Sequence, residues 1–467
     1  MTSPRKKIPL FSLVLLIITA IDSIKNLPAS ALFGSELIFF FCLSALLFLG
    51  PTALVAAELS AMFPEQGGVY HWINRAFGKK WAMVAIWMQW INTMVWYPTI
   101  LSFIAGTFAY LINPALAENS WFLLSTILVV FWTITLINLK GAHVSAKMNS
   151  VCGLIGTALP LLLLALGGAI WFAKGHPIQI SFTKESLLPS FNNAGNWVSL
   201  IAMMASFLGM ELAGVHVNDI KDPQRNFPKA VLYSSGFILV SMILGSLAVA
   251  IVIPEQEINL TAGVMQVFAK MCNEFGIGMV VPIITILIII GSIGNITSWL
   301  ISPAKGLLHA AEFGFLPATF AKKNKHGVAT KILLIQALLV SIFCFLFISV
   351  PSINGAFWFL TALSTELYMI MYVLMFLAAI KLHYTFIDRP KSFKIPGQKM
   401  GMWSICIIGL CGCFATIGVS FLPPRNVDVG SSLRYISMIC IGNLITISPI
   451  LGFYWYQKNR SSLRILK

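Results

Sequence analysis

Long runs of apolar residues restrict the fold of this chain more than any other feature. Two examples are ELIFFFCLSALLFLGPTALVAAEL and VVPIITILIIIGSIG. A run of about 20 apolar residues is long enough to cross the hydrocarbon core of a bilayer as a helix. Because lipid offers no hydrogen-bond partner, the backbone of such a run must satisfy itself, and a helix does so within one segment. The sequence therefore predicts an all-α integral membrane protein.

Twelve transmembrane helices are predicted. Of the 467 residues, 58% are hydrophobic and only 10% are charged, whereas a soluble domain carries about 25% charged residues. The third span is too long for a straight crossing, so we expect it to tilt or bend. The expected spans are 10–33, 37–60, 82–112, 121–138, 149–172, 196–218, 230–252, 278–302, 331–350, 356–380, 403–422 and 433–456.

The formal charge of +15 is distributed as a topology signal and not as a nucleic-acid-binding surface. An even number of spans places both termini on one side, and that side holds 25 of the 31 Lys and Arg residues. Five lie in the opposite loops, and Lys25 lies within a span. This is the positive-inside pattern, so we expect both termini in the cytoplasm and no nucleic-acid partner.

Spans 1 and 6 are interrupted by residues that do not suit a continuous helix in lipid. Span 1 breaks at DSIKN, residues 22–26, and span 6 breaks at residues 209–214. Close helix packing at Gly209 and Gly214 is the alternative explanation of the second break. Interrupted helices at matching positions of two inverted halves indicate a substrate site at the bilayer midplane. We expect inverted five-helix repeats in 1–175 and 176–385, followed by two helices and a short cytoplasmic tail in 386–467.

A broken helix exposes N–H groups on one half and C=O groups on the other, which attract a carboxylate and an ammonium group respectively. A small zwitterionic amino acid carries both groups, so we expect the breaks to bind one. The residues expected to line this site are Ser23, Ile24, Lys25, Asn26, Gly209, Met210, Glu211 and Gly214.

Ionisable side chains inside a span are costly and often functional. Lys25 is a candidate cation for a substrate carboxylate or a partner for Glu211. Pairing with Asp22, three residues earlier, is the structural alternative. Asp22 could instead cap the second half-helix. Glu211 is a candidate to bind the substrate amine, to carry a proton, or both.

Other polar residues have more limited roles. Asn295 and Trp299 lie on one polar stripe of span 8, which fits either a cavity wall or hydrogen bonding between helices. Glu58 and Glu312 lie near span ends, where gating or loop pairing is expected. The His and Asp residues near the end of span 6 are too few for a metal site, and we expect neither a metal nor a cofactor.

Three segments are informative together, namely AAELSAMFPEQGGVYHWINRAFGKKWA, FLGMELAGVHVNDIKDPQRNFPKA and SWLISPAKGLLHAAEFGFLPATFAKKNKHGVATKILLIQAL. They resemble segments of the amino acid–polyamine–organocation superfamily of transporters, and within it the bacterial glutamate:γ-aminobutyrate antiporter branch. The resemblance implies a twelve-helix, five-plus-five inverted-repeat fold that works by alternating access. The substrate would lie between helices 1, 3, 6, 8 and 10.

The same resemblance implies roles for single residues. Glu211 matches the glutamate after the glycine of the sixth helix, and Lys305 matches a basic residue after the eighth. Tyr368 and Tyr372 match tyrosines that line the path, and Asp219 matches an acidic residue at the inner end of helix 6. The first break departs from the family pattern, because it reads SIKN instead of a Gly-Ser-Gly sequence. Ala205 also stands where related antiporters can carry an aromatic gate.

We therefore expect an amino acid antiporter of the bacterial inner membrane, with glutamate- or γ-aminobutyrate-like substrates. Proton-coupled import is the alternative, with Lys25 and Glu211 as proton carriers. A membrane sensor that binds an amino acid without moving it is an alternative of another class. An enzyme is not expected, because the chain has no His-Glu-x-x-His and no Gly-x-Ser-x-Gly motif.

Overall fold

The computed structural model describes residues 8–63, 68–140, 151–189, 194–211, 220–312, 316–386, 393–424 and 426–455. Within these ranges the chain is helical, and extended pairing is limited to one bridge between Ile8 and Ile220. The N–H group of Lys221 donates to the carbonyl of Ile8 at 3.0 Å beside this bridge. The predicted all-α class is confirmed.

The helices divide into two long series and a set of short turns. The first series is α1 (Leu10–Ile21), α2 (Leu27–Ala31), α3 (Leu37–Ser44), α4 (Gly50–Met62), α5 (Gly68–Phe77), α6 (Lys79–Ile112), α7 (Ser120–Leu139), α9 (Leu159–Ala173) and α10 (Lys184–Leu187). The second is α11 (Ser199–Ala205), α12 (Pro223–Val252), α13 (Gly263–Glu274), α14 (Val281–Glu312), α15 (Thr330–Cys344), α16 (Leu346–Ser349), α17 (Ile353–Thr385), α18 (Gln398–Val419) and α19 (Ser432–Ile447). The 3-10 turns are η1 (Ile24–Asn26), η2 (Gly34–Glu36), η4 (Pro114–Glu118), η6 (Ala194–Val198), η8 (Glu255–Glu257), η9 (Gly278–Val280) and η10 (Ala318–Phe320), and the π-helical turns are η3 (Ala45–Leu49) and η5 (Leu154–Ala158).

The spans agree with the predicted set. Eleven segments of the described chain are long and apolar enough to cross a membrane, and each overlaps one predicted span. The remaining predicted span, the sixth (196–218), corresponds to the shorter apolar helix Gly195–Ala205. Its residues 212–218 lie outside the described residues. The predicted third span is α6, whose 34 residues include Pro98. At about 1.5 Å per residue it is about 50 Å long, more than a straight crossing needs.

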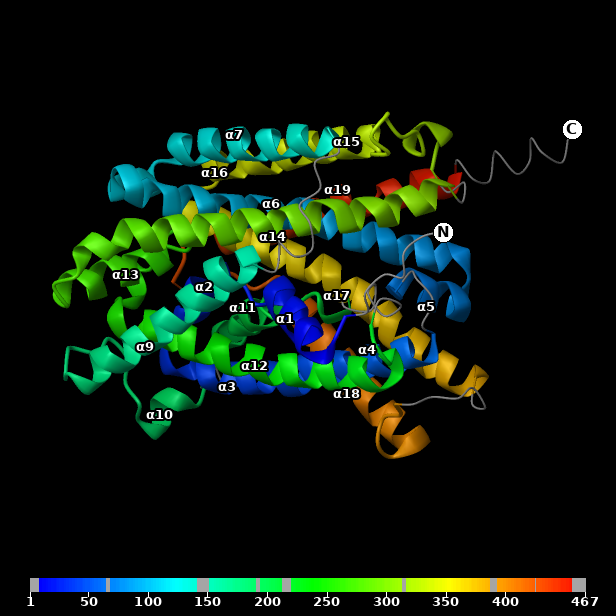
Figure 1. Cartoon of the computed structure of the whole chain (residues 1–467), viewed down its shortest axis with the longest axis horizontal. Coiled ribbons are helices and arrows are strands. Elements are labelled where there is room, and N and C mark those ends of the chain that lie inside the picture. Colours follow the sequence, from blue (N-terminus) through cyan, green and yellow to red (C-terminus); the bar gives the residue numbers. More distant parts are fainter. Residues whose placement is uncertain are drawn as a thin grey trace, which may run out of the picture.

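Helix α6 lies at the centre of the bundle, where it packs against both α14 and α17. Of the apolar stretch of each span, 72% is buried in α6 and 78% in α17, but only 17% in the last span, Ser432–Trp455. The bundle therefore has a packed interior and an apolar outer surface, as expected of a protein that faces lipid. Figure 1 shows α7 and α15 side by side along one edge.

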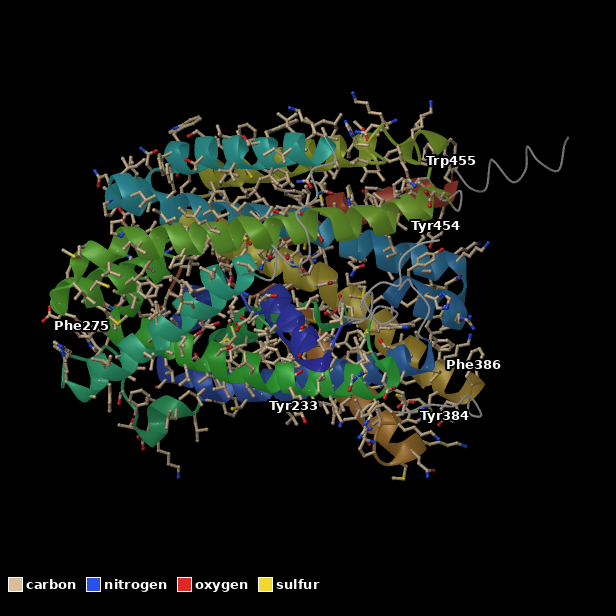
Figure 2. The ribbon with its side chains drawn as sticks, in the orientation of Figure 1. Tyr233, Phe275, Tyr384, Phe386, Tyr454 and Trp455 are labelled. Atoms are coloured by element: carbon tan, nitrogen blue, oxygen red, sulfur yellow. The ribbon has the colours of Figure 1, made fainter. Side chains whose placement is uncertain are left out.

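Aromatic side chains lie at both ends of the bundle. Phe275 is at one end, and Tyr384, Phe386, Tyr454 and Trp455 are at the other (Figure 2). The helices run along the line that joins the two groups (Figure 1). Aromatic residues at opposite ends of a helical bundle are typical of the two interfaces of a membrane.

A pair of glycines brings η5 and α14 into close contact. A Cβ atom added to Gly156 would lie 2.3 Å from the Cα atom of Gly291, and one added to Gly291 would lie 2.4 Å from the backbone of Gly156. Small residues at a crossing let two membrane helices approach closely. This contact holds the fifth and eighth spans together next to the first break, because Gly153 of the same segment packs on Thr19.

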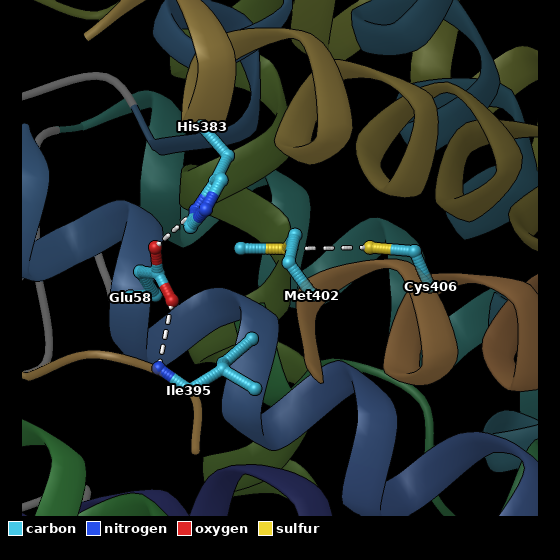
Figure 3. A network of polar contacts seen from close by, with 5 residues as sticks. All are labelled: Glu58, His383, Ile395, Met402 and Cys406. Atoms are coloured by element: carbon cyan, nitrogen blue, oxygen red, sulfur yellow. Dashed lines mark hydrogen bonds and ion pairs between the residues drawn. The ribbon is translucent and has the colours of Figure 1, made fainter. Parts of the chain in front are cut away.

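A polar network ties α4, α17 and the segment before α18 together (Figure 3). Oε1 of Glu58 lies 3.0 Å from Nδ1 of His383, and Oε2 accepts the backbone N–H of Ile395 at 2.8 Å. On α18, Sγ of Cys406 lies 3.5 Å from Sδ of Met402. Of the two roles predicted for Glu58, gating or loop pairing, the structure shows the pairing with the segment before α18. Glu312 also pairs with a loop residue, because it forms an ion pair with Lys323 at 2.9 Å.

Candidate functional site

The first break lies where the sequence predicted it. α1 ends at Ile21, and Asp22 and Ser23 are extended, with ψ angles of 116° and 107°. Asp and Ser favour such positions because their side chains compete with the helical backbone for hydrogen bonds. The chain re-enters a helix at η1 and α2, and Pro28 occupies the first turn of α2, where a missing N–H is tolerated.

The second break begins earlier than predicted. α11 ends at Ala205, and residues 206–209 form a turn before a short helical turn at 210 and 211. Ser206 Oγ donates to the carbonyl of Ala202 at 2.9 Å, a bond that competes with the helical ladder. Gly209 has a φ angle of +103°, which glycine adopts at little cost. Gly214 and Asp219 lie outside the described residues.

The carboxylate of Glu211 joins the second break to α17 and α6. Tyr368 Oη donates to Oε1 of Glu211 at 2.5 Å, and Tyr372 Oη donates to Oε2. Gln89 of α6 donates through Nε2 to Oε1 at 3.4 Å, and the Gly209 N–H donates to Tyr372 Oη at 3.0 Å. The two tyrosines are one helical turn apart, so they reach the same carboxylate. Glu211 is fully buried, with an exposed fraction of 0%.

A pocket opens between the two breaks. Five of the residues expected from the sequence line it, namely Ser23, Asn26, Asn295, Trp299 and Tyr368. The pocket wall does not include six others, Ile24, Lys25, Gly209, Met210, Glu211 and Tyr372. Glu211 therefore lies behind Tyr368, which separates it from the pocket. Lys305 belongs to α14, but its side chain is not among those that the structure describes.

Lys25 points toward α6 and α17 from the first break. Its Nζ donates to Oδ1 of Asn26 at 2.9 Å, and it lies 5.4 Å from the ring centre of Trp96 and 5.7 Å from that of Phe357. These distances allow cation–π attraction. The ammonium group is buried, with 2% of the residue exposed. Asn26 and Trp96 both line the pocket, so they connect Lys25 to it.

The two charge pairs considered as alternatives for Lys25 are not formed among the described residues. Within the described residues, Lys25 has an ion pair with neither Asp22 nor Glu211. Asp22 also does not cap the second half-helix, because its Oδ2 lies 2.9 Å from Ser241 Oγ of α12. The physical reason is the extended backbone at Asp22 and Ser23, which removes the helical spacing that would place residues three apart on one face.

The family resemblance placed the third span, α6, at the site, but its polar pocket residues were not identified from the sequence. Asn92, Thr93 and Trp96 line the pocket, and Gln89 lies one turn before them. Residues at i, i+3, i+4 and i+7 form one face of a helix, so the polar stripe was visible within an otherwise apolar span. Ser364 of α17 donates to Oδ1 of Asn92 at 2.7 Å and fixes its orientation. Ile21, Ala205 and Leu208 complete the wall.

One acceptor in the pocket wall is left for a ligand. Within the described part of the chain, Oδ1 of Asn295 is buried without a hydrogen-bond partner. An unsatisfied buried acceptor is costly, so a bound donor would stabilise the site. The rings of Trp96 and Trp299, which also line the pocket, lie 5.5 Å apart. The site thus combines an open acceptor, an aromatic wall and a nearby buried cation.

Comparison with known proteins supports this description. A family model described as amino acid permease matches residues 8–444. An uncharacterized transporter of Legionella pneumophila is 38% identical over 445 residues, covering 95% of this chain and 96% of the relative. A glutamate/γ-aminobutyrate antiporter of Lactococcus lactis is 28% identical over 458 residues, covering 97% and 91%.

The fold is also similar to that of a solved transporter. A manganese transporter of Eremococcus coleocola, solved in complex with an aromatic bis-isothiourea compound, superposes with a TM-score of 0.62. The alignment covers 97% of this chain and 98% of that one, at 12% identity. At this identity the likeness concerns the fold alone. The match of the family model to nearly the whole chain shows that the protein belongs to the amino acid permease family of membrane transporters.

Proposed function

We propose that this protein is an antiporter that exchanges amino acids, with glutamate- or γ-aminobutyrate-like substrates. Its relative in Lactococcus lactis carries that name. We further propose that exchange occurs by alternating access between two inverted repeats, 1–175 and 176–385, with 386–467 outside them. The two broken helices support this organisation, because each repeat would begin with one of them.

The observation that carries the substrate proposal is the buried ammonium group of Lys25. Removing an ion from water costs several kcal/mol unless an opposite charge compensates it. Within the described residues the contacts of Lys25 are an amide oxygen and two aromatic rings. A substrate carboxylate in the pocket would supply the missing charge. The substrate ammonium would then face Oδ1 of Asn295 and the carbonyl end of α1.

Glu211 has a positioning role in this proposal. Because Tyr368 separates it from the pocket, Glu211 would hold the tyrosine wall and transmit its movement to the second break. Asp219 and Lys305 are proposed as gating residues on the basis of the family resemblance.

An exchange assay tests the function. The purified protein is reconstituted into vesicles that are either empty or loaded with unlabelled glutamate, and uptake of labelled glutamate and γ-aminobutyrate is measured. Loaded vesicles should take up label several-fold faster, because a loaded carrier returns more readily than an empty one. Equal rates in the two preparations would rule out exchange. A competition panel of acidic, neutral and basic amino acids then identifies the substrate class.

Proton-coupled import is the second candidate, and a buried carboxyl group at the first break, Asp22, favours it. For both candidates we propose the inner membrane of a bacterium, with both termini in the cytoplasm. The bias of Lys and Arg residues toward one set of loops supports this topology. Reporter fusions at the C-terminus test it: a fluorescent protein should be active there, and a periplasmic phosphatase should be inactive.

A further inference from the structure

Asp22 is a buried acid that the proposed substrate site does not use. It occupies the first break directly after α1, and 1% of the residue is exposed. It does not line the pocket. Within the described residues Oδ1 is buried without a hydrogen-bond partner, and the contact of Oδ2 is with Ser241 Oγ at 2.9 Å. A charged carboxylate in such a position would lack most of the hydrogen bonds that it has in water.

The geometry at Ser241 shows which protonation state of Asp22 allows the hydrogen bonds around it to form. Ser241 Oγ lies 2.9 Å from Oδ2 of Asp22 and 3.1 Å from the carbonyl oxygen of Ile238. The hydroxyl has a single hydrogen for these two acceptors. If Oδ2 carries a proton, it donates to Ser241 Oγ, and the hydroxyl donates to Ile238. The neutral acid therefore completes both bonds. With the carboxylate, the single hydrogen of Ser241 must serve either Oδ2 of Asp22 or the carbonyl of Ile238, which also lies within the helical ladder of α12.

Among the described residues, the ionisable groups on the elements around the first break do not offer a counter-charge to Asp22. Lys25, on the break itself, points to Trp96 and Phe357. On α12, Tyr233 is eight residues from Ser241, about 12 Å along the helix axis, and Lys229 and Arg225 are farther. Near η5 the nearest such group is the thiol of Cys152, which packs on Gly294 of α14. The other ionisable residues of α14 are at its C-terminal end, namely Lys305, His309 and Glu312.

We propose that Asp22 holds a proton in this conformation and releases it when the first break opens to water. The proposal rests on the transport function proposed above and names a coupling group for it. When the break opens to one side, water hydrates the carboxyl group and the proton leaves on that side. When the break is open to the other side, the carboxylate takes up a proton there before it closes. The proton is neither created nor consumed, and the carboxyl group carries it from one side of the membrane to the other with each cycle.

Infrared difference spectroscopy of the purified protein tests the protonation directly. The C=O stretch of a carboxylic acid is separate from that of a carboxylate, so the wild-type protein at neutral pH should show an acid band that Asp22→Asn lacks. Ser241→Ala should keep this band but shift its frequency, because the acceptor of the acid hydrogen is removed. A wild-type spectrum without an acid band assignable to Asp22 would overturn the proposal. This result does not depend on transport activity.

Proton flux tests the coupling. In reconstituted vesicles, a pH-sensitive dye measures the number of protons moved, and labelled amino acid measures the number of substrate molecules moved. The two measurements give the proton-to-amino-acid ratio. In Asp22→Asn the proton-to-amino-acid ratio should fall to zero, because the amide cannot titrate. Asp22→Glu should retain a ratio equal to that of the wild type, at a changed rate. An unchanged ratio in Asp22→Asn would overturn the proposal.

The two proposals fail in different ways. If the wild type exchanges amino acids without any proton flux, Asp22 is not a coupling group, and the exchange function stands. If the wild type moves no amino acid at all, the function proposed above fails, whatever the infrared spectrum shows for Asp22.

Discussion

The hydroxyl group of Tyr368 donates a hydrogen bond to Oε1 of Glu211 at 2.5 Å. Tyr368 is part of the pocket wall, and Glu211 is not. The bond therefore links a surface that a ligand touches to the second helix break, through a carboxylate that is fully buried. A change at Glu211 should act on the substrate through the orientation of Tyr368.

Glu211→Gln is expected to weaken substrate binding by about tenfold to a hundredfold, since hydrogen bonds to a charged group contribute about 1.5–3 kcal/mol. The amide oxygen still accepts from Tyr368, but the amide N–H group faces the hydroxyl of Tyr372. One of the two hydrogen bonds from the tyrosines to residue 211 is therefore lost. Binding of labelled amino acid to the purified variant measures this. Tyr368→Phe should show a similar loss, and Glu257→Gln, remote from the pocket, should show none. Wild-type affinity in both site variants would contradict the linkage.

Lys25→Met is expected to remove the preference for substrates with an acidic group. If Lys25 compensates a substrate carboxylate, its loss should weaken binding of acidic amino acids by at least about tenfold and affect neutral ones less. Competition assays with matched acidic and amide amino acids provide the measurement. Lys25→Arg keeps the charge and should keep the preference. Equal losses for the acidic and amide compounds would show that Lys25 is structural.

Gly156→Ala is expected to destabilise the bundle, because the added methyl group would overlap the backbone of Gly291. Overpacking of this kind costs about 1–3 kcal/mol. Thermal unfolding in detergent should show a lower midpoint for Gly156→Ala. Gly236→Ala on α12 is the matched control, because nothing lies within 4 Å of the added Cβ atom. A midpoint equal to that of the control would mean that the two helices can move apart freely.

Glu58→Ala is expected to loosen the end of the bundle at which α4, α17 and α18 meet. The carboxylate holds His383 and the N–H of Ile395, and their loss frees the segment before α18. Cys406, fully buried on α18, should then react faster with a maleimide, as measured by mass spectrometry of its peptide. Glu312→Ala, which breaks an exposed ion pair, should leave the rate at Cys406 unchanged. If Cys406 reacts no faster with maleimide in Glu58→Ala than in the wild type, Glu58 does not hold this end of the bundle together.

Glu255 gives a pH-dependent prediction outside the spans. Burial, followed by the negative charge of Glu36, raises the pKa of Glu255 from its ordinary value of 4.5. The folded state then binds the proton more tightly than the unfolded state, so stability is full below pH 4.5 and decreases as the pH rises through the raised pKa. Glu255→Gln should remove this decrease, as measured by unfolding midpoints across pH 4–8. A variant with the same pH profile as the wild type would contradict it.

The spans and the first break could be predicted from the sequence because each depends on local composition. Apolar length decides where a chain crosses lipid, and Asp22, Ser23 and Pro28 disfavour a continuous helix where the structure breaks. The second break began earlier because Ser206 and Gly209 end α11 together. The prediction relied on the glycines and did not use Ser206.

The directions of side chains at the breaks could not be predicted. Spacing rules assume a helix or a strand, and neither applies to Asp22 and Ser23. Asp22 lies against α12, and Lys25 lies against α6 and α17, so the pairing considered as the structural alternative is not formed. The polar face of α6 at Asn92 and Thr93 could have been predicted from its helical spacing, but it is a minor part of a long apolar run.

Equilibrium binding of labelled glutamate and γ-aminobutyrate to the purified protein tests the central claim most directly, when the wild type is compared with Ala205→Trp. Ala205 ends α11 and lines the pocket, so an indole there would fill the space between the two breaks, while Ala205→Ser would leave it open. The account predicts saturable binding of at least one of the two compounds to the wild type and the serine variant, and none to the tryptophan variant. Saturable binding that survives in Ala205→Trp with unchanged affinity would place the substrate elsewhere and contradict the account.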